Sequence, residues 1–310
     1  MSHDTLVEQA TRTIEAGSHS FAAATRLFDA PTRESAVLLY AWCRHCDDVV
    51  DGQSLGHGQV QGSRADGLER LARLRQQTLD ACTGRPCADP VFEGLAEVVQ
   101  RHGISHTLPM EHLAGFAMDV QGMHYRTLAD TLLYSWRVAG VVGVMMARVM
   151  GADRPATLDR ACDLGLAFQL TNIARDVVED AAIGRLYLPA DWLAEEGIDG
   201  LPGVLDPARR EALARVAARL VAAADPYYAS AVAGIGELPL RCAWSIATAR
   251  GIYRQIGRKV RSQGGRAWDG RVATSRVEKL WFVARGAAVA LAAHGIPLPP
   301  RPPGLFTRPL

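Results

Sequence analysis

The spacing with the clearest chemical meaning is a pair of aspartates four residues apart, which occurs twice within segments of helical hydrophobic pattern. One pair is Asp47 and Asp51, and the other is Asp176 and Asp180. Residues at this spacing lie on one face of a helix, so each pair presents two carboxylates that repel one another. Hard divalent ions such as Mg²⁺ bind carboxylate oxygens together with water and phosphate oxygens. The two pairs therefore predict sites for a divalent cation and a phosphate-bearing substrate.

The second segment adds two amides, because Gln169 and Asn172 fall on the same helical stripe as Asp176 and Asp180. A polar stripe on a helix is usually its solvated face. Here the flanking residues are apolar, which favours a helix that is surrounded by protein: Leu164, Leu166, Phe168 and Leu170. Buried carboxylates need a partner or a metal, so we expect the stripe to point into a cavity. Phe168, Ile173 and Val177 lie off it and are expected to face the core.

Cationic residues gather late in the chain, around Tyr253: Arg254, Arg258, Lys259, Arg261, Arg271, Arg276 and Lys279. Most are expected to be solvated surface charges, and some to contact the phosphate oxygens that the metal also bridges. Acid pairs, a divalent metal and basic residues around an apolar cavity indicate a prenyl diphosphate. The metal would make the diphosphate a leaving group, and helical walls would shelter the carbocation.

Bulk properties exclude several classes of protein. The chain has 310 residues, 48% of them hydrophobic, and a net charge of +1, with no basic stripe of the kind that binds nucleic acid. Its first residues are polar, unlike a signal peptide, and no apolar run is expected to reach membrane-spanning length because Arg148 interrupts the one from Val138 to Val149. Six scattered cysteines suit a reducing compartment. Cys43 and Cys46 imitate a metal spacing, but small residues on the buried side of a helix are the favoured interpretation.

The hydrophobic period predicts an all-α fold, with one helical domain over residues 1–295 and a Pro-rich, extended C-terminal tail over 296–310. The first aspartate pair should end a long helix, followed by a mobile loop from Gly52 to Gly67. Further helices are expected at 68–82, 90–102, 109–123, 129–150, 155–180, 207–233, 239–260 and 276–293. The connection over 183–207 is long enough to suggest a lid. Gly140 and Gly143 should let a neighbouring helix or an apolar substrate approach closely.

Together these features resemble the squalene and phytoene synthase family, and most closely its bacterial phytoene-forming members. The resemblance runs from about Ala16 to Ala293 and rests on five segments: Gly17-Ser18-His19-Ser20-Phe21, Tyr40 to Asp48, Val138-Ala139-Gly140, Gln169 to Asp180, and Arg185-Leu186-Tyr187-Leu188-Pro189. It implies a single-domain, isoprenoid-synthase-type helical bundle around a central cavity. His19 stands where the family often has lysine, and Trp136 replaces a common tyrosine and is expected to wall the cavity.

The resemblance also implies roles for individual residues. Metal ligands would be Asp47, Asp51, Asp176, Asp180 and Asn172. Catalytic residues would be Arg44, Tyr134 and Tyr253. Substrate contacts would come from Ser18, Ser20, Phe21, Arg44, Asp48, Gln169, Asn172, Arg175, Tyr253, Arg271 and Lys279. Of these, Tyr253, Arg271 and Lys279 are placed by the weakest sequence match.

The implied activity joins two molecules of geranylgeranyl diphosphate head to head, through prephytoene diphosphate, to give phytoene for carotenoid biosynthesis. Such a prenyltransferase would use about two or three Mg²⁺ ions, which Mn²⁺ could replace, and would need no NADPH. The expected location is the cytoplasm, with peripheral contact to the cytoplasmic membrane, because the product is insoluble in water. Other enzymes of the carotenoid pathway are candidate partners.

Four alternatives stay open on the sequence alone. Farnesyl diphosphate could be coupled instead, to squalene with NADPH or to dehydrosqualene without it, since cavity depth decides chain length. A head-to-tail elongase fits Asp47 to Asp51 but not the second site, where Arg175 stands in place of a doubled aspartate. A non-catalytic assembly protein on the same fold would be expected to have lost its aspartates. A zinc module on Cys43 and Cys46 would bind stoichiometric zinc.

Overall fold

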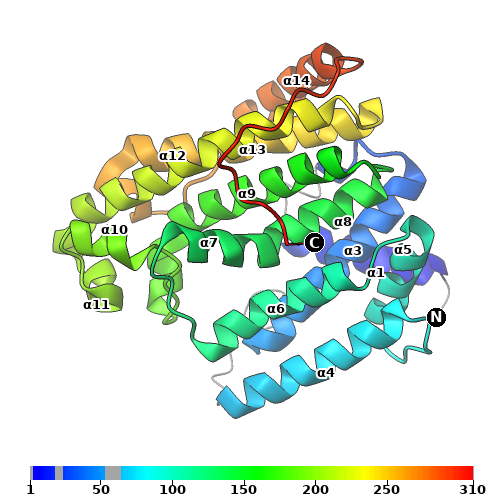
Figure 1. Ribbon diagram of the computed structural model, residues 1–310, viewed down its shortest axis with the longest axis horizontal. Coiled ribbons are helices and arrows are strands. Elements are labelled where there is room, and N and C mark those ends of the chain that lie inside the picture. The colour runs from blue at the N-terminus through cyan, green and yellow to red at the C-terminus, as the bar shows by residue number, and fades with distance from the viewer. Residues whose placement is uncertain (1–2, 18–23, 53–63, 310) are drawn as a thin grey trace.

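The computed structural model describes residues 3–17, 24–52 and 64–309, apart from the side chain of Asp51. All regular secondary structure in these ranges is helical, which confirms the predicted all-α fold (Figure 1). In chain order the longer helices are α1 (His3–Gly17), α3 (Ala30–Asp51), α4 (Arg64–Cys82), α5 (Pro90–His102), α6 (Thr107–Gln121), α7 (Leu128–Ser135), α8 (Val141–Val149), α9 (Pro155–Ala182), α12 (Arg210–Ile235), α13 (Leu240–Gln263) and α14 (Arg276–Ala293). Shorter elements are η1 (Trp136–Gly140), α10 (Ala190–Glu195), α11 (Gly200–Leu205), η2 (Pro207–Arg209) and η3 (Gly264–Trp268).

The ends of the first aspartate helix, α3, are determined by local sequence. The carboxylate of Asp29 caps it by accepting a hydrogen bond from the backbone N–H of Thr32 at 2.9 Å, and Pro31 occupies its first turn. Gly52 ends it in a left-handed conformation, with φ of 62°. The acid pair therefore lies in the last turn, as predicted. Most of the mobile loop predicted from Gly52 to Gly67 lies outside the described residues, and α4 already begins at Arg64.

The second aspartate helix, α9, occupies the middle of the bundle. It packs against α8 and η1 on one side and against α12 and α13 on the other (Figure 1). The helix begins at Pro155. Proline suits this position because a backbone N–H in the first turn would have no partner within the helix, and proline has none. The central position explains why its flanking residues are apolar: this helix has little surface left to expose to solvent.

The segment from α7 through η1 to α8 is a continuous helical run with a wide π-helical turn at Trp136–Gly140. The run Leu128–Val149 is long and apolar enough to span a membrane by length and composition, so the expectation that no run reaches that length was wrong. The expectation considered only the apolar run from Val138, whereas the whole helix from Leu128 is apolar enough despite Arg137 and Arg148. In the fold, 56% of the window is buried inside the bundle, as in a core helix of a globular protein.

The connection after α9 is more structured than predicted. It contains the short helices α10 and α11, and it buries Leu188, Trp192 and Leu193. Backbone bonds fix it to the loop before α7, since the N–H of Ala190 donates to the carbonyl of Tyr125 at 2.9 Å. This segment is therefore part of the core packing.

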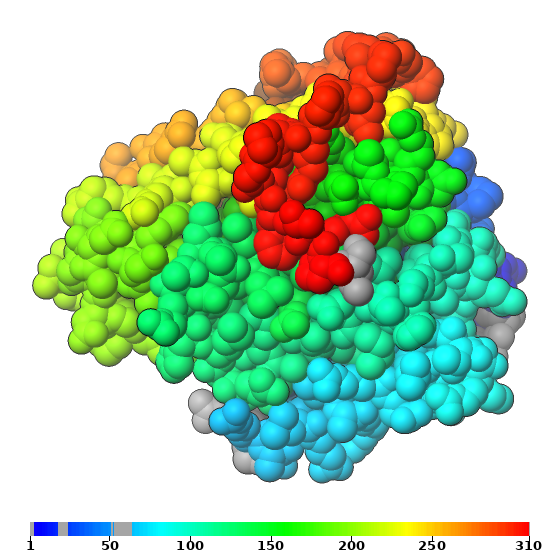
Figure 2. All heavy atoms as spheres, viewed as in Figure 1, coloured from blue at the N-terminus to red at the C-terminus, as the bar shows by residue number. Residues whose placement is uncertain are grey.

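The C-terminal residues 296–309 form no helix and lie across the face of the molecule seen in Figure 2. Arg301 forms an ion pair with Asp163 of α9 at 2.5 Å, and Arg308 with Asp159 at 2.5 Å. The backbone N–H of Phe306 donates to the hydroxyl of Tyr227 at 3.1 Å. The tail is thus attached to the first half of α9 by ion pairs and to α12 by a hydrogen bond.

Candidate active site

The polar stripe of α9 stays partly accessible, although most of this helix is buried. Gln169, Asn172, Asp176 and Asp180 are only partly buried, along with Arg175 beside them. The residues between them on the helix are buried: Leu170, Thr171, Ile173, Ala174 and Val177. Gln169 and Asn172 line a partly open cavity of about 290 Å³. The sequence prediction that the stripe points into a cavity is confirmed for these two amides.

Glycines bring the wall of this cavity against α9. A Cβ at Gly165 would lie 2.4 Å from the carbonyl oxygen of Ala139, and one at Gly143 would lie 2.5 Å from that of Ala161. Real side chains do not tolerate such distances, so the close approach requires glycine at both positions. The π-helical turn presents Val138 and Ala139 to the cavity at this crossing. The predicted close approach is therefore confirmed, with α9 as the neighbouring helix.

A second apolar cavity, of about 210 Å³, lies next to the first. It reaches α3, where Tyr40 and Cys43 line it, and α13, where Ile252 does. Both cavities share five lining residues: Val142, Met146, Phe168, Ile246 and Tyr253. Phe168 was expected to face the core, but it lies between the cavities and stacks on Tyr253 with ring centroids 4.2 Å apart. The two cavities therefore adjoin along an aromatic partition.

The electrostatics of the α9 stripe favour an added cation. Two nitrogens of the Arg175 guanidinium donate hydrogen bonds to the two carboxylate oxygens of Asp176. Burial and the neighbouring Asp176 raise the pKa of Asp180 to about 7. Asn172 donates to Gln169 at 3.4 Å, and its own Oδ1 is buried without a hydrogen-bond partner among the described residues. A carboxylate that is costly to ionise and an unsatisfied amide oxygen are the donor set of a hard divalent ion.

These groups fit Mg²⁺, although protein side chains alone do not assemble a full ligand set. Among the described residues, no three His, Cys, Asp or Glu side chains lie close enough together to hold a metal. Substrate phosphate and water would have to supply the rest of the coordination shell.

On α3, Arg44 holds the first acid site together. Its guanidinium contacts Asp47 at 3.1 Å and Asp48 at 2.9 Å. The side chain of Asp51 lies outside the described residues, as do Ser18, His19, Ser20 and Phe21 of the N-terminal motif. Cys43 lies on the cavity side of the helix, and burial raises its thiol pKa to about 12, so it stays protonated. All six cysteines are free, which agrees with a packing role for Cys43 and Cys46.

Tyr134 belongs to a separate buried group that the sequence did not predict. Its hydroxyl donates to Asp119 on α6 at 3.1 Å, and Tyr187 donates to the other oxygen of the same carboxylate at 3.0 Å. The two rings stack at 4.5 Å, with Tyr125 against their edges. Asp119 also raises the pKa of Asp180, so this group adjoins the acid end of α9. Asp119 was missed because it is a single acid without a spacing pattern.

The remaining residues that were predicted to contact the substrate or wall the cavity lie in different parts of the fold. Tyr253 is partly buried at the aromatic partition, where desolvation raises its pKa, and both Arg175 and Arg271 lie close enough to affect that pKa. Lys279 lies on the outer helix α14, and none of the contacts described above includes it. Trp136 does not line either cavity; it is fully buried and lies 6.4 Å from Phe306 of the tail, so its expected place in the cavity wall was wrong.

Comparisons with known proteins agree with this arrangement. Residues 14–278 match the family model described as squalene/phytoene synthase. The chain is 51% identical to "Phytoene synthase" of Pseudescherichia vulneris and 50% identical to "15-cis-phytoene synthase" of Pantoea ananas, each over the full length of both chains. A crystal structure of a dehydrosqualene synthase in complex with ligand superposes with a TM-score of 0.82 at 26% identity, covering 94% of this chain and 98% of that one. On this evidence, the chain belongs to the squalene/phytoene synthase family.

Proposed function

We propose that this protein is a phytoene synthase, which joins two molecules of geranylgeranyl diphosphate head to head. The observation that carries the proposal is the pair of adjoining apolar cavities, which share an aromatic partition, with the polar stripe of α9 at one wall. Two such cavities suit two prenyl chains whose reacting ends must meet. Relatives about half identical over their whole length are named phytoene synthases, which supports this product over squalene.

The cation required by this chemistry would be Mg²⁺, or Mn²⁺ in its place. Asn172, Asp176 and Asp180 would hold it on α9, and Asp47 with Asp51 would hold it on α3. When bound, it would neutralise the diphosphate and so make it a better leaving group. Arg44, Arg175 and Arg271 would add charge to the same end of the substrate. The apolar walls would exclude water from the allylic cation.

Each half of the reaction loses one diphosphate and one proton. The first forms the cyclopropyl ring of prephytoene diphosphate, and the second opens it to give phytoene. The stacked rings of Phe168 and Tyr253 present π faces that stabilise positive charge between the cavities. Because its raised pKa keeps Tyr253 protonated, released diphosphate is the better proton acceptor. No hydride donor enters this sequence of bond changes.

The deciding experiment supplies the purified protein with geranylgeranyl or farnesyl diphosphate, each with Mg²⁺ and with or without NADPH, and identifies the hydrocarbon by mass spectrometry. We expect phytoene from geranylgeranyl diphosphate in both NADPH conditions. Squalene that forms only with NADPH, or dehydrosqualene from farnesyl diphosphate alone, would reject the proposal in favour of those related activities.

We place this activity in the cytoplasm, at the surface of the membrane that receives the hydrocarbon. The six free cysteines support a reducing compartment. Fractionation of cells that express the chain would test the location: the protein should be found with cytoplasm and membrane, and recovery outside the cytoplasmic membrane would contradict it.

A further inference from the structure

Helix α14 exposes several of its large apolar residues on the outside of the molecule. It lies at the edge of the bundle, on the far side of α13 from α9 (Figure 1). Four large apolar side chains on it are exposed: Val277 by 76%, Leu280 by 71%, Trp281 by 53% and Leu291 by 64%. They lie on one side of the helix, and the exposed Ala284 and Ala288 connect Trp281 to Leu291 along it. We call this apolar stripe the α14 outer face.

The orientation of α14 is fixed by close packing on α13. A Cβ at Gly286 would lie 2.3 Å from Oγ1 of Thr248, and one at Gly251 would lie 2.5 Å from the ring of Phe282. Ala290 is also fully buried. Because glycine allows the two helices to meet at these points, the opposite face must point away from the protein. The exposure of the apolar stripe therefore follows from a well-packed inner face.

Positive charge surrounds the α14 outer face. Arg276 and Arg285 are exposed on the helix, and the guanidinium of Arg285 lies 5.1 Å from the ring centre of Trp281. The one acid of α14, Glu278, faces inward and is bound by Lys259 and by the N–H of Ser275. Burial, together with Arg254, Arg285 and Arg258 nearby, lowers the pKa of Arg250 to about 10. The helix is thus apolar and cationic on the side that faces away from the bundle.

We propose that the α14 outer face docks the protein on an anionic lipid bilayer. An exposed apolar helix face with flanking arginines and a tryptophan is the pattern of a helix that lies in the membrane interface. The charges decide against a second copy of this chain as the occupant. A two-fold contact through this face would bring Arg276 and Arg285 against their own copies, while the one acid of α14, Glu278, faces inward. Anionic headgroups supply the missing negative charge.

If the product is the apolar hydrocarbon of the proposed function, the position of the α14 outer face near the cavity suits its release into a membrane. The side of α13 opposite α14 lines the second cavity through Ile246, Ala249 and Tyr253. One helix therefore separates the docking face from the apolar interior. Docking would bring the cavity close to the only phase in which a long hydrocarbon dissolves. The docking itself stands on exposure and charge, so it can hold even if the substrate differs.

The test is flotation of the full chain with vesicles of phosphatidylcholine alone or with about one third phosphatidylglycerol. The docking variant is V277Q/L280Q/W281Q, which keeps good helix formers at exposed positions. The control is L68Q/L205Q, which removes two exposed leucines from α4 and α11. Circular dichroism and activity on detergent-dispersed substrate establish that both variants fold.

We expect the wild type and the control to float with the anionic vesicles, and the docking variant to bind at least about tenfold more weakly. Arg285→Gln should reduce binding to anionic vesicles but not to vesicles of phosphatidylcholine. Two results would overturn the proposal. One is a wild-type chain that stays with the soluble fraction at physiological salt. The other is a wild-type chain that forms dimers by sedimentation, lost in the docking variant, without binding vesicles.

Discussion

The two aspartate helices, α3 and α9, place the same acid spacing in different surroundings. On α9, Asp176 is 18% exposed, and the helix is enclosed by α8, α12 and α13. On α3, Asp47 is 39% exposed and shares one arginine, Arg44, with Asp48. A cation at α9 would therefore act in a drier environment, where electrostatic interactions are stronger. The acids of α9 should contribute more to binding and catalysis than those of α3.

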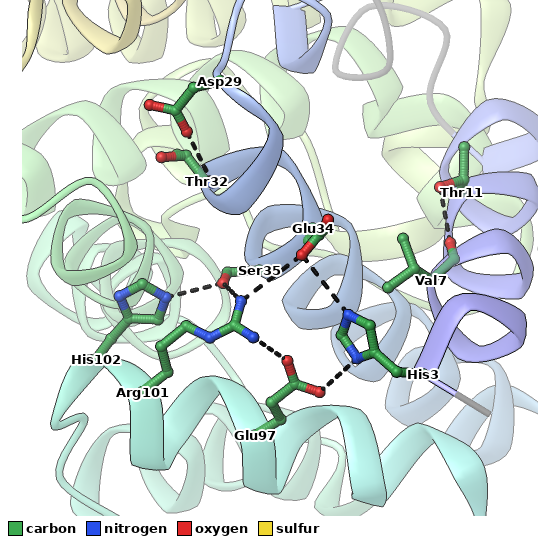
Figure 3. Close-up of polar contacts among 10 residues, drawn as sticks. All are labelled: His3, Val7, Thr11, Asp29, Thr32, Glu34, Ser35, Glu97, Arg101 and His102. Atoms are coloured by element: carbon green, nitrogen blue, oxygen red, sulfur yellow. Dashed lines mark hydrogen bonds and ion pairs between the residues drawn. The ribbon is translucent and has the colours of Figure 1, made fainter. Parts of the chain in front are cut away.

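The first halves of the two helices differ in the same way. Near the start of α9, Asp163 is fully buried and is bound by Arg301 of the tail and by Ser230. Near the start of α3, Glu34 belongs to a charged network with His3, Glu97 and Arg101 that is partly exposed to solvent, next to the buried Ser35 (Figure 3). Buried ion pairs are costly to break, whereas exposed ones contribute little. Mutation should thus reveal α9 as the more strongly fixed element.

The largest expected effect is on catalysis at α9. Asp176→Asn removes a proposed cation ligand while keeping its shape, and should lower phytoene formation at least about a thousandfold. The same change at Asp47 on α3 should cost less, about tenfold to a hundredfold. Initial rates with unchanged circular dichroism provide the measurement. Glu179→Gln, at an exposed position of α9, is the matched control and should keep full activity; equal losses at Asp176 and Asp47 would break the comparison.

The next effect is on stability through the tail. Arg301→Ala leaves the buried carboxylate of Asp163 without its guanidinium partner and should cost about 3 kcal/mol of unfolding free energy. Chemical denaturation of the full chain measures this quantity. Arg266→Ala, at an exposed arginine, serves as the control. A loss at Arg301 no greater than the control's would mean that the tail does not fix α9.

Stability should depend on pH through Asp180, because burial and the neighbouring Asp176 raise the pKa of this residue to about 7. Between the unfolded and folded pKa values the folded state binds more protons, so its stability falls as pH rises. Without divalent ions, the wild type should lose melting temperature from about pH 5 to pH 8 relative to Asp180→Asn. Added Mg²⁺ should restore it at the upper end. Parallel melting curves for the two proteins would contradict this assignment.

The smallest effect should come from the exposed network on α3. Glu34→Ala removes contacts with His3 at 3.6 Å and Arg101 at 3.9 Å, both partly exposed to water. Its cost should be about 0–1 kcal/mol, well below that of Arg301→Ala. The same denaturation experiment measures both. A cost for Glu34→Ala that matches Arg301→Ala would remove the difference between the two helices.

Much of this fold could be predicted because its helix ends have local causes. Asp29, Pro31 and Gly52 mark α3, and the period of apolar residues marks α9 and α14. The stripe of Gln169 and Asn172 was predicted for the same reason, since spacing on one helix determines which residues share a face. Family resemblance added residues such as Arg44, whose contacts with Asp47 and Asp48 the structure describes.

Contacts between distant segments could not be predicted. Asp119 meets Tyr134 and Tyr187 only through tertiary packing, and no spacing in the sequence signals it. The position of Trp136 next to the tail has the same origin. The pattern of α14 predicts a helix but not which side faces out. That orientation depends on Gly251 and Gly286, which decide where α13 and α14 touch.

The central claim is that the α9 stripe binds prenyl diphosphate together with a divalent cation. The most direct test is calorimetric binding of an unreactive thio analogue of geranylgeranyl diphosphate, with Mg²⁺ or with chelator, to the wild type and to Asp176→Asn. We expect tight binding only for the wild type with Mg²⁺. Equal affinity with chelator, or equal affinity for Asp176→Asn, would contradict it.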